Sequence, residues 1–232
     1  MLAPSSETVT LAGGPTEVQW RRSARARQVS LRIDARGGAV VITLPPRASR
    51  RSGLQLLMTH ADWVRGRLAA LPRPVPFADG ALVPLHGVEH RIVHMPGGRG
   101  VRVVDGIIEV AGALEFLPRR VGDFLRAEAR RQLSGLAIAK AAQTGIAARR
   151  ISVKDTKSRW GSCSAKRDLA FSWRLVMAPA FVQDYVAAHE VAHLRHMNHS
   201  ASFWNQVDAL TRHRVAGMDW LRHEGPQLMR IG

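Results

Sequence analysis

Hydrophobic and polar residues alternate from about residue 28 onward. Val29, Leu31 and Ile33 share one face of an extended segment, "DARGG" follows, and "AVVITL" then runs up to two consecutive prolines. Period-two alternation interrupted by a glycine-containing turn is typical of a β-hairpin. We therefore predict two antiparallel strands within residues 28–44.

The hydrophobic spacing then becomes helical, and afterwards returns to short extended segments. The helical positions, which predict an amphipathic helix ending near "LPRPVP", are Leu54, Leu57, Ala61, Val64 and Leu68. The segments "HRIVHM", "VRVV" and "IIEV" follow, and Asp105-Gly106 joins the last two. Both turn residues tolerate positive φ, so this dipeptide predicts a tight hairpin.

A second long helix is predicted from Pro118 to about Ala142, with a basic face of arginines outside its apolar stripe. In "LAFSWRL", large apolar residues alternate with smaller or polar ones, which predicts a half-buried strand. Pro179 then suits the first turn of another helix, which carries "HEVAHLRHMNH". The fold class expected is α+β: a mainly antiparallel β region with a helix over residues 1–116, then a helix-rich region over 117–232. We see no internal repeat in the sequence.

Composition narrows the class of protein. The 232 residues are 46% hydrophobic and 22% charged, as in ordinary globular proteins. No apolar run reaches eighteen residues, and "MLAPSSETVTLAGGP" lacks the basic and apolar regions of a secretory signal, so we expect a cytoplasmic protein with no membrane partner. The single cysteine, Cys163, excludes an internal disulfide framework and fits a reducing compartment.

The net charge of +16 and the pI near 11.6 raise the question of a polyanionic partner such as nucleic acid. Arginine supplies 30 of the 34 basic residues, a skew that GC-rich coding alone also produces. The charge is spread along the chain, with +6 on residues 1–116 and +10 on residues 117–232. Charge therefore makes nucleic acid a candidate partner, although no recognised DNA-binding motif accompanies it.

The strongest chemical signal is H-E-x-x-H at residues 189–193. A helical rise of about 1.5 Å per residue places His189 and His193 one above the other, so that both imidazoles can reach one ion. Imidazole is a suitable zinc ligand. Glu190 is offset by about 100° around the helix, where it can take a proton from metal-activated water without binding the metal. The motif predicts zinc ligands at both histidines and a general base at Glu190.

A catalytic zinc needs a third protein ligand, and several residues compete for this position. His196 stays on the same helical face, but three ligands stacked along a straight helix cannot approach tetrahedral angles. His199 becomes usable if the helix stops near Asn198, and we favour it over His196 and the downstream acids, Asp208 and Glu224. The spacing is also that of metzincins, but His196 stands where they have glycine, so we do not assign the chain to them.

At "SRWGSCS", "LAFSWRLVMAP" and "YVAAHEVAHLRHMNHSASFWNQV" the sequence resembles the YgjP-like metal-dependent hydrolases, relatives of the SprT-like and Wss-type zinc peptidases. The close resemblance covers about residues 151–220. It implies a zincin-like catalytic region within 117–232, in which the motif helix packs on a small antiparallel sheet. It also implies zinc on His189, His193 and His199, a catalytic Glu190, and kinship with proteases that act on DNA-linked proteins.

Residues around the motif receive weaker assignments. Arg159, Trp160, Gly161 and Ser162 are predicted to form a turn and edge strand beside the site, where an extended substrate could pair with the backbone. Core packing is an equal alternative for Trp160, and we expect Trp204 to pack behind the site. Cys163 is expected to be a buried thiol. Candidate donors for an oxyanion are Tyr185, Arg159 and His213.

The sequence thus predicts a zinc-dependent hydrolase, and specifically a metallopeptidase that cleaves a peptide or protein substrate with Glu190 as general base. Two alternatives stay open. One is a zinc-stabilised nucleic-acid-binding module without turnover, which would have a closed fourth coordination position. The other is a zinc hydrolase of a non-peptide amide or ester.

Overall fold

The computed structural model describes residues 5–11 and 14–232. The prediction that the N-terminal segment lacks a secretory signal therefore falls partly outside the described residues. The chain divides into two compact units, Met1–Arg73 (unit 1) and Pro74–Gly232 (unit 2). We expected a division after residue 116 instead. The boundary lies earlier because buried residues of the strands at 82–111 belong to the same hydrophobic core as the long helix that follows them.

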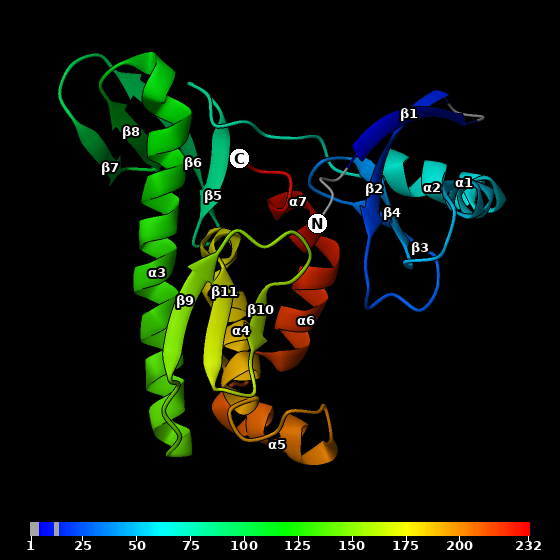
Figure 1. The fold of residues 1–232 in the computed structure, drawn as a ribbon. Coiled ribbons are helices and arrows are strands. Elements are labelled where there is room, and N and C mark those ends of the chain that lie inside the picture. The colour runs from blue at the N-terminus through cyan, green and yellow to red at the C-terminus, as the bar shows by residue number, and fades with distance from the viewer. Residues whose placement is uncertain (1–4, 12–13) are drawn as a thin grey trace. The chain divides into compact units, whose positions relative to one another are not determined.

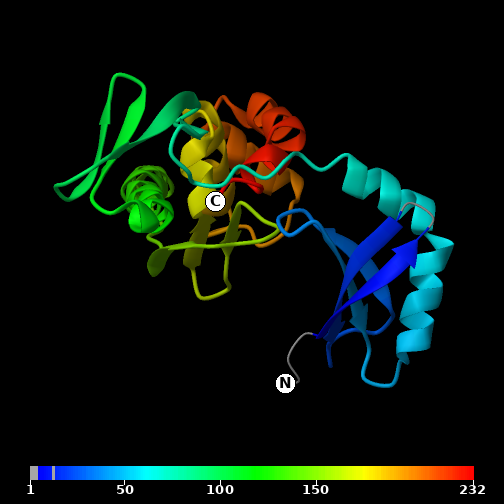
Figure 2. The same cartoon turned by 90° about the horizontal axis from the view of Figure 1, so that it is seen from above.

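Unit 1 is a four-stranded sheet with two helices on one face (Figures 1 and 2). The strand order is β1-β2-β4-β3, and the elements are β1 (Ser5–Leu11), β2 (Gly14–Arg22), β3 (Ser30–Asp34), β4 (Ala39–Leu44), α1 (Arg50–Thr59) and α2 (Ala61–Ala69). The expected hairpin is confirmed as the antiparallel pair β3–β4. The expected single helix is two helices with a break at His60.

The sheet of unit 1 buries alternate residues beneath its helices, as period-two alternation requires. Val18 and Trp20 of β2 and Ile42 of β4 are 0–5% exposed. Gly53 of α1 allows the helix to approach closely, because a Cβ atom there would lie 2.6 Å from the Trp20 ring. These contacts define which face of the sheet is covered and which is not.

Unit 2 begins with a second four-stranded sheet of the same topology. Its order is β5-β6-β8-β7, with β5 (Leu82–Leu85), β6 (Val88–Met95), β7 (Gly100–Val104) and β8 (Ile107–Ala111). The outer pairs are antiparallel and the central pair is parallel, as in unit 1. Asp105 and Gly106 have φ values of 47° and 76°, which confirms the predicted hairpin turn between β7 and β8. The fold therefore contains a structural repeat that the sequence did not reveal.

The remainder of unit 2 surrounds one long helix, seen nearly end on in Figure 2. The elements are α3 (Leu117–Thr144), β9 (Arg150–Lys154), β10 (Gly161–Cys163), β11 (Asp168–Ser172), a 3-10 helix (Trp173–Met177), α4 (Ala180–Ala192), α5 (Ala201–Leu210), α6 (Arg214–His223) and α7 (Gly225–Leu228). Helix α3 contacts both sheets of unit 2 and α4. The α+β class is confirmed.

The details differ from expectation in two places. Each sheet contains one parallel pair, whereas we expected antiparallel sheets, because alternation identifies a strand but not its partner. The strand expected through "LAFSWRL" ends at Ser172, and the chain continues as a 3-10 helix. Residues 169–178 are all buried, so this segment is not half exposed but lies inside the core.

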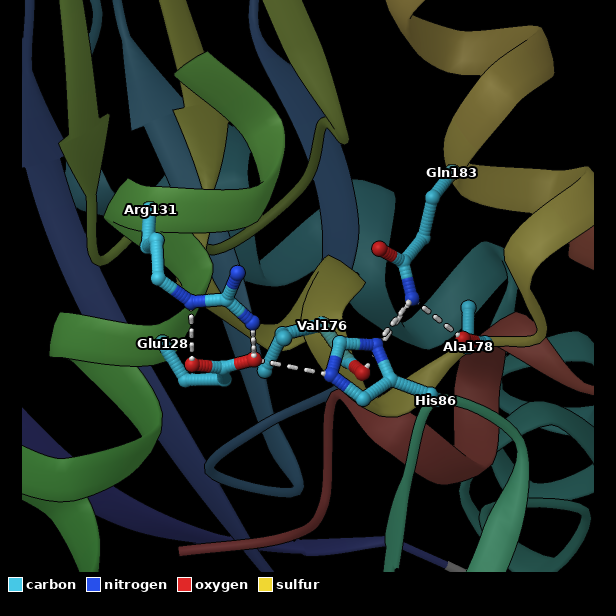
Figure 3. A network of polar contacts seen from close by, with 6 residues as sticks. All are labelled: His86, Glu128, Arg131, Val176, Ala178 and Gln183. Carbon is cyan, nitrogen blue, oxygen red and sulfur yellow. Dashed lines mark hydrogen bonds and ion pairs between the residues drawn. The ribbon is translucent and has the colours of Figure 1, made fainter. Parts of the chain in front are cut away.

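A polar network fixes the beginning of α4 (Figure 3). In the β5–β6 turn, the backbone N–H of His86 donates a hydrogen bond to the Val176 carbonyl at 2.8 Å. The ring Nε2 of His86 lies 3.0 Å from Oε1 of Glu128, and its Nδ1 lies 3.2 Å from Nε2 of Gln183. Gln183, on α4, also donates to the Ala178 carbonyl. The turn, α3 and the first turns of α4 are thereby joined ahead of the histidine motif.

No helix among the described residues is both long enough and apolar enough to cross a membrane.

Candidate metal centre

Helix α4 positions His189 and Glu190, but it ends earlier than we expected. Its last residue is Ala192, and His193 occupies the C-cap with φ −66° and ψ −15°. A turn follows, in which the amides of Leu194 and Arg195 donate to the carbonyls of residues 191 and 192. The regular helix therefore ends at Ala192, earlier than the stop expected near Asn198, and after the turn at 193–195 the chain bends at Met197 and Asn198.

This turn brings His199 back to the helix. Its Nε2 lies 3.2 Å from Nε2 of His189, and the ring centroids of His199 and His193 are 4.9 Å apart. One nitrogen from each of His189, His193 and His199 lies within 4.8 Å of the others. Two nitrogens bound to one zinc ion at about 2.0–2.1 Å in a tetrahedral arrangement lie roughly 3.4 Å apart, so the closest pair has a suitable spacing.

The tautomer of His193 is set by the turn itself. Its Nδ1 lies 2.8 Å from the carbonyl oxygen of His196, which can only accept, so Nδ1 carries the proton. The lone pair is then on Nε2. A ligating histidine commonly donates its second nitrogen to a backbone carbonyl in this way. His196 thus contributes its backbone, and its side chain is not part of the cluster.

The three imidazoles suit a cation because two of them resist protonation. Burial lowers the pKa of His189 to about 4, and the neighbouring His193 and His199 add to the shift. Burial also lowers the pKa of His193, against the effect of its bond to the His196 carbonyl. Neutral imidazole is the form that binds a metal. The donor set is therefore available at neutral pH and could hold a metal ion.

Two aromatic residues of α5 pack against the imidazoles. The Phe203 ring is fully buried, and its centroid lies 4.5–5.0 Å from those of all three histidines. The Trp204 ring lies 5.9 Å from His189 and 5.7 Å from His199, which agrees with the packing role expected for it. Ser200 is the N-cap of this helix, and no side-chain capping bond is present among the described residues.

Glu190 lies beside this cluster in a confined space. It is 5% exposed, and its Oε2 has no hydrogen-bond partner among the described residues. Burial raises the pKa of Glu190 to about 8, and the positive charge of Arg159 opposes the rise. A carboxylate with this pKa can accept and release a proton near neutral pH.

The strand β10 runs past this carboxylate at the edge of the sheet β10-β11-β9. Gly161 is its first residue, and a Cβ atom there would lie 2.4 Å from Oε1 of Glu190. Ser162 follows on the same strand, and Arg159 is an exposed residue just ahead of it. Trp160 is partly buried, where its ring packs near Gly225 and its carbonyl accepts from Ser172. The four residues assigned to substrate binding thus lie beside Glu190, and their role stays a prediction.

The three candidate oxyanion donors have different surroundings. Burial raises the pKa of Tyr185 to about 12, with a further contribution from Glu190, so its hydroxyl stays protonated beside the site. Arg159 is close enough to influence Glu190. The His213 ring instead packs against Phe181 at 6.0 Å, eight residues or about 12 Å of helix before His189.

Arg214 is a neighbour that we did not identify from the sequence. Its guanidinium lies 5.4 Å from the Trp204 ring centroid, and its Nε donates to Oδ1 of Asp208 at 2.6 Å. Its charge also lowers the pKa of Tyr185, although burial dominates there. No spacing or motif signals this residue, because it is placed by the packing of α6 against α4.

Other residues with side chains able to bind a metal lie outside the histidine cluster. Asp208 pairs with Arg214, and neither Asp208 nor Glu224 belongs to the histidine cluster. His90 and His94 interact through their rings with the carbonyls of Val88 and Gly112. Cys163 is partly buried rather than fully buried, and burial followed by the charge of Glu190 raises its pKa to about 11. Its thiol is therefore neutral at physiological pH.

Three converging imidazoles and a buried carboxylate on an α+β scaffold are the features of a metal-dependent hydrolase. A family model described as YgjP-like, metallopeptidase domain, matches residues 27–224, and the chain belongs to this family. The match extends well ahead of the segment 151–220 that carried the resemblance in the sequence, and it includes part of unit 1. Comparisons with curated proteins and with solved structures found no match.

Proposed function

We propose that this chain is a zinc-dependent peptidase in which His189, His193 and His199 hold the metal and Glu190 is the general base. One arrangement carries the proposal: the Nε2 atoms of His189 and His199 approach to 3.2 Å, and Oε2 of the adjacent Glu190 is buried without a partner. An unpaired buried acceptor is unfavourable unless it serves a ligand, a water molecule or a reaction.

Zinc is the metal that best fits these donors. Three protein ligands including histidine are usual in catalytic zinc sites, which keep a position for water or substrate. Among the described residues, no fourth histidine, cysteine or carboxylate joins the cluster. This favours a catalytic site over the closed site of a purely structural module. A zinc ion held there would supply Lewis acidity toward a carbonyl and make water more acidic.

Glu190 would transfer the proton. Its carboxylate would accept a proton from the attacking water and then donate it to the departing amine. Burial raises the pKa of Glu190 and so favours this second step, whereas the charge of a bound cation would lower that pKa and favour the first. Tyr185 and Arg159 are the chain's candidates for hydrogen bonding to the developing oxyanion.

The substrate class follows from β10. This strand pairs with β11 on one side, and within the described part of the chain its other edge has no strand partner in the sheet. An extended peptide can add to such an edge through backbone hydrogen bonds. Because β10 begins at Gly161, against Glu190, a peptide paired there would pass close to the carboxylate. This favours a peptide over other amides or esters.

The test compares the wild-type protein with Glu190→Gln, using fluorescently labelled unfolded casein for proteolysis and p-nitrophenyl acetate for ester hydrolysis. We expect casein cleavage that requires zinc and is abolished in Glu190→Gln, with zinc content unchanged in the variant. Equal cleavage by both proteins would overturn the role of Glu190. Ester hydrolysis without casein cleavage would instead favour a non-peptide hydrolase, and zinc binding without either activity would favour a structural module.

A further inference from the structure

The positive charge is concentrated in unit 1. Its 73 residues contain 12 arginines, no lysine and four acidic residues, a net charge of +8. The 159 residues of unit 2 contain 22 basic and 14 acidic residues, also +8. Half of the charge therefore lies on less than a third of the chain. Unit 2, with the same sign, supplies no countercharge.

Of the four acidic residues of unit 1, only Glu17 is exposed on the open face of its sheet, where it lies opposite Thr8 and accepts a hydrogen bond from Nε2 of Gln19 at 3.2 Å. The other three do not neutralise that face. Glu7 pairs with Arg50 and Asp62 with Arg65, and both of these arginines lie on the helices. Asp34 is 3% exposed. Arginines without an ion pair among the residues that the structure describes include Arg21, Arg25, Arg27 and Arg32. All four are exposed.

Two of these four arginines lie on the sheet face that α1 and α2 leave uncovered, and the other two lie in the loop that connects two of its strands. Arg21 of β2 lies opposite Thr43 of β4, and Arg32 of β3 lies opposite Val41, which is also in β4. Thr43 and Val41 are two residues apart, so both arginine side chains are on one face of the sheet. Trp20, the neighbour of Arg21, points to the helices instead. Arg25 and Arg27 lie in the connection between β2 and β3. The other positions on this face include one carboxylate, Glu17, and are otherwise mostly hydroxyl or amide residues: Ser6, Thr8, Thr10, Gln19, Ser30 and Thr43.

The second sheet of the chain has the same strand order but a different open face. There Arg102 pairs with Glu109, and the register places Val104 opposite Ile107. The corresponding face of unit 1 has unpaired arginines and, among its described residues, no exposed large hydrophobic side chain. The arginine content of the whole chain does not account for this difference between two sheets of one topology.

We infer that the open face of the unit 1 sheet binds the phosphate backbone of double-stranded nucleic acid without regard to base sequence. Arginine, serine, threonine and glutamine side chains are the usual donors to phosphate oxygens. The face carries no aromatic side chain on which bases could stack, which disfavours a single-stranded ligand. An anionic membrane is disfavoured because the exposed apolar residues of unit 1, Met58 and Trp63, belong to the helices.

The test measures binding of a fluorescent 20-base-pair duplex to the full chain by anisotropy, over a range of salt concentrations. The test variant replaces Arg21, Arg25, Arg27 and Arg32 with glutamine. The matched control removes four positive charges from the same unit, as Arg47→Gln, Arg51→Gln, Arg65→Gln and Arg67→Gln. In the test variant we expect the slope of log affinity against log salt to fall by about 3.6, at roughly 0.9 per phosphate contact. Binding at 0.15 M salt should weaken at least about tenfold, and the control should change much less.

Equal losses in the two variants would show diffuse attraction and overturn the inference, as would the absence of wild-type binding at 0.15 M salt. If the fourfold test variant does not fold, the loop variant Arg25→Gln with Arg27→Gln, which leaves the sheet unchanged, should lose about half of that slope. Tighter binding to a single-stranded oligonucleotide than to the duplex would also contradict the inference. So would binding to phosphatidylglycerol vesicles that the test variant loses to the same extent as duplex binding. The result does not depend on peptidase activity.

Discussion

The carboxylate of Glu190 occupies the space that a side chain at Gly161 would need. A Cβ atom at residue 161 would lie 2.4 Å from Oε1 and 2.6 Å from Cδ of Glu190. Gly161 has no positive φ, so glycine is required there for space and not for backbone conformation. The strand β10 and the carboxylate therefore constrain each other.

Gly161→Ala should displace Glu190 and reduce hydrolysis while the metal stays bound. A misplacement of about 1 Å at a reacting group can lower the rate roughly 100-fold. We expect a loss of this order in kcat, with zinc content and the helical circular dichroism signal unchanged. Gly135→Ala, on α3, is a matched control, because a Cβ atom there meets nothing within 4 Å. An unimpaired Gly161→Ala enzyme would show that the carboxylate position does not matter.

His199→Ala and His196→Ala should differ in metal affinity. His199 contributes a ring nitrogen to the cluster, whereas His196 contributes its carbonyl, which alanine retains. Loss of an outer partner of a metal ligand already costs about 10–100-fold in affinity, and loss of a ligand should cost at least that. Competition with a chromophoric zinc chelator measures both constants. A larger loss in His196→Ala would mean that the third ligand is misassigned.

The sequence predicted the site best where one local rule determines the structure. Helical periodicity alone places His189 one turn before His193, and the structure keeps that relationship. His199 depended on where the helix ends, and no breaker residue indicates the end after Ala192. The turn there is stabilised by the bond from His193 to the His196 carbonyl, a contact that spacing does not predict.

Nonlocal relations were the ones that the sequence could not supply. Alternation identified β3, β4 and β8, but not the parallel pairs β2–β4 and β6–β8, because pairing depends on segments distant in sequence. The polar segment that forms β1 gave no clear alternation of apolar residues. The contact between Gly161 and Glu190 is likewise a tertiary contact. A glycine in the sequence indicates that another group can approach closely, but it does not indicate which group.

The contribution of Glu128 to stability should disappear in acid. Its hydrogen bond from Arg131 lowers the pKa below the usual 4.5, burial opposes this, and the bond to His86 lowers it further. A carboxyl whose folded-state pKa is depressed stabilises the protein fully above its unfolded-state pKa. That contribution is lost as the pH falls through the folded-state value. Glu128→Gln should therefore lower the free energy of unfolding by about 1–2 kcal/mol at pH 7.

Thermal or urea unfolding of both proteins at pH 7 and pH 3 measures this effect. The difference between wild type and Glu128→Gln should be much smaller at pH 3. Glu115→Gln serves as control, because Glu115 is exposed and has no ion pair among the described residues. A difference that stays constant with pH would show that the carboxylate charge is not the source of the stabilisation.

Cys163 should react slowly with iodoacetamide until the pH is high. Burial raises its pKa from 9.0 to about 11, and the charge of Glu190 is the next largest cause. Only the thiolate reacts, so a shift of this size lowers the rate near neutral pH by roughly 100-fold relative to an ordinary cysteine. The chain has one cysteine, so mass spectrometry of zinc-free protein from pH 7 to 11 follows this site directly. In Glu190→Gln the midpoint should fall but stay above 9.0, because burial remains. A midpoint unaffected by that substitution would mean that the carboxylate and the thiol do not interact along this face of β10.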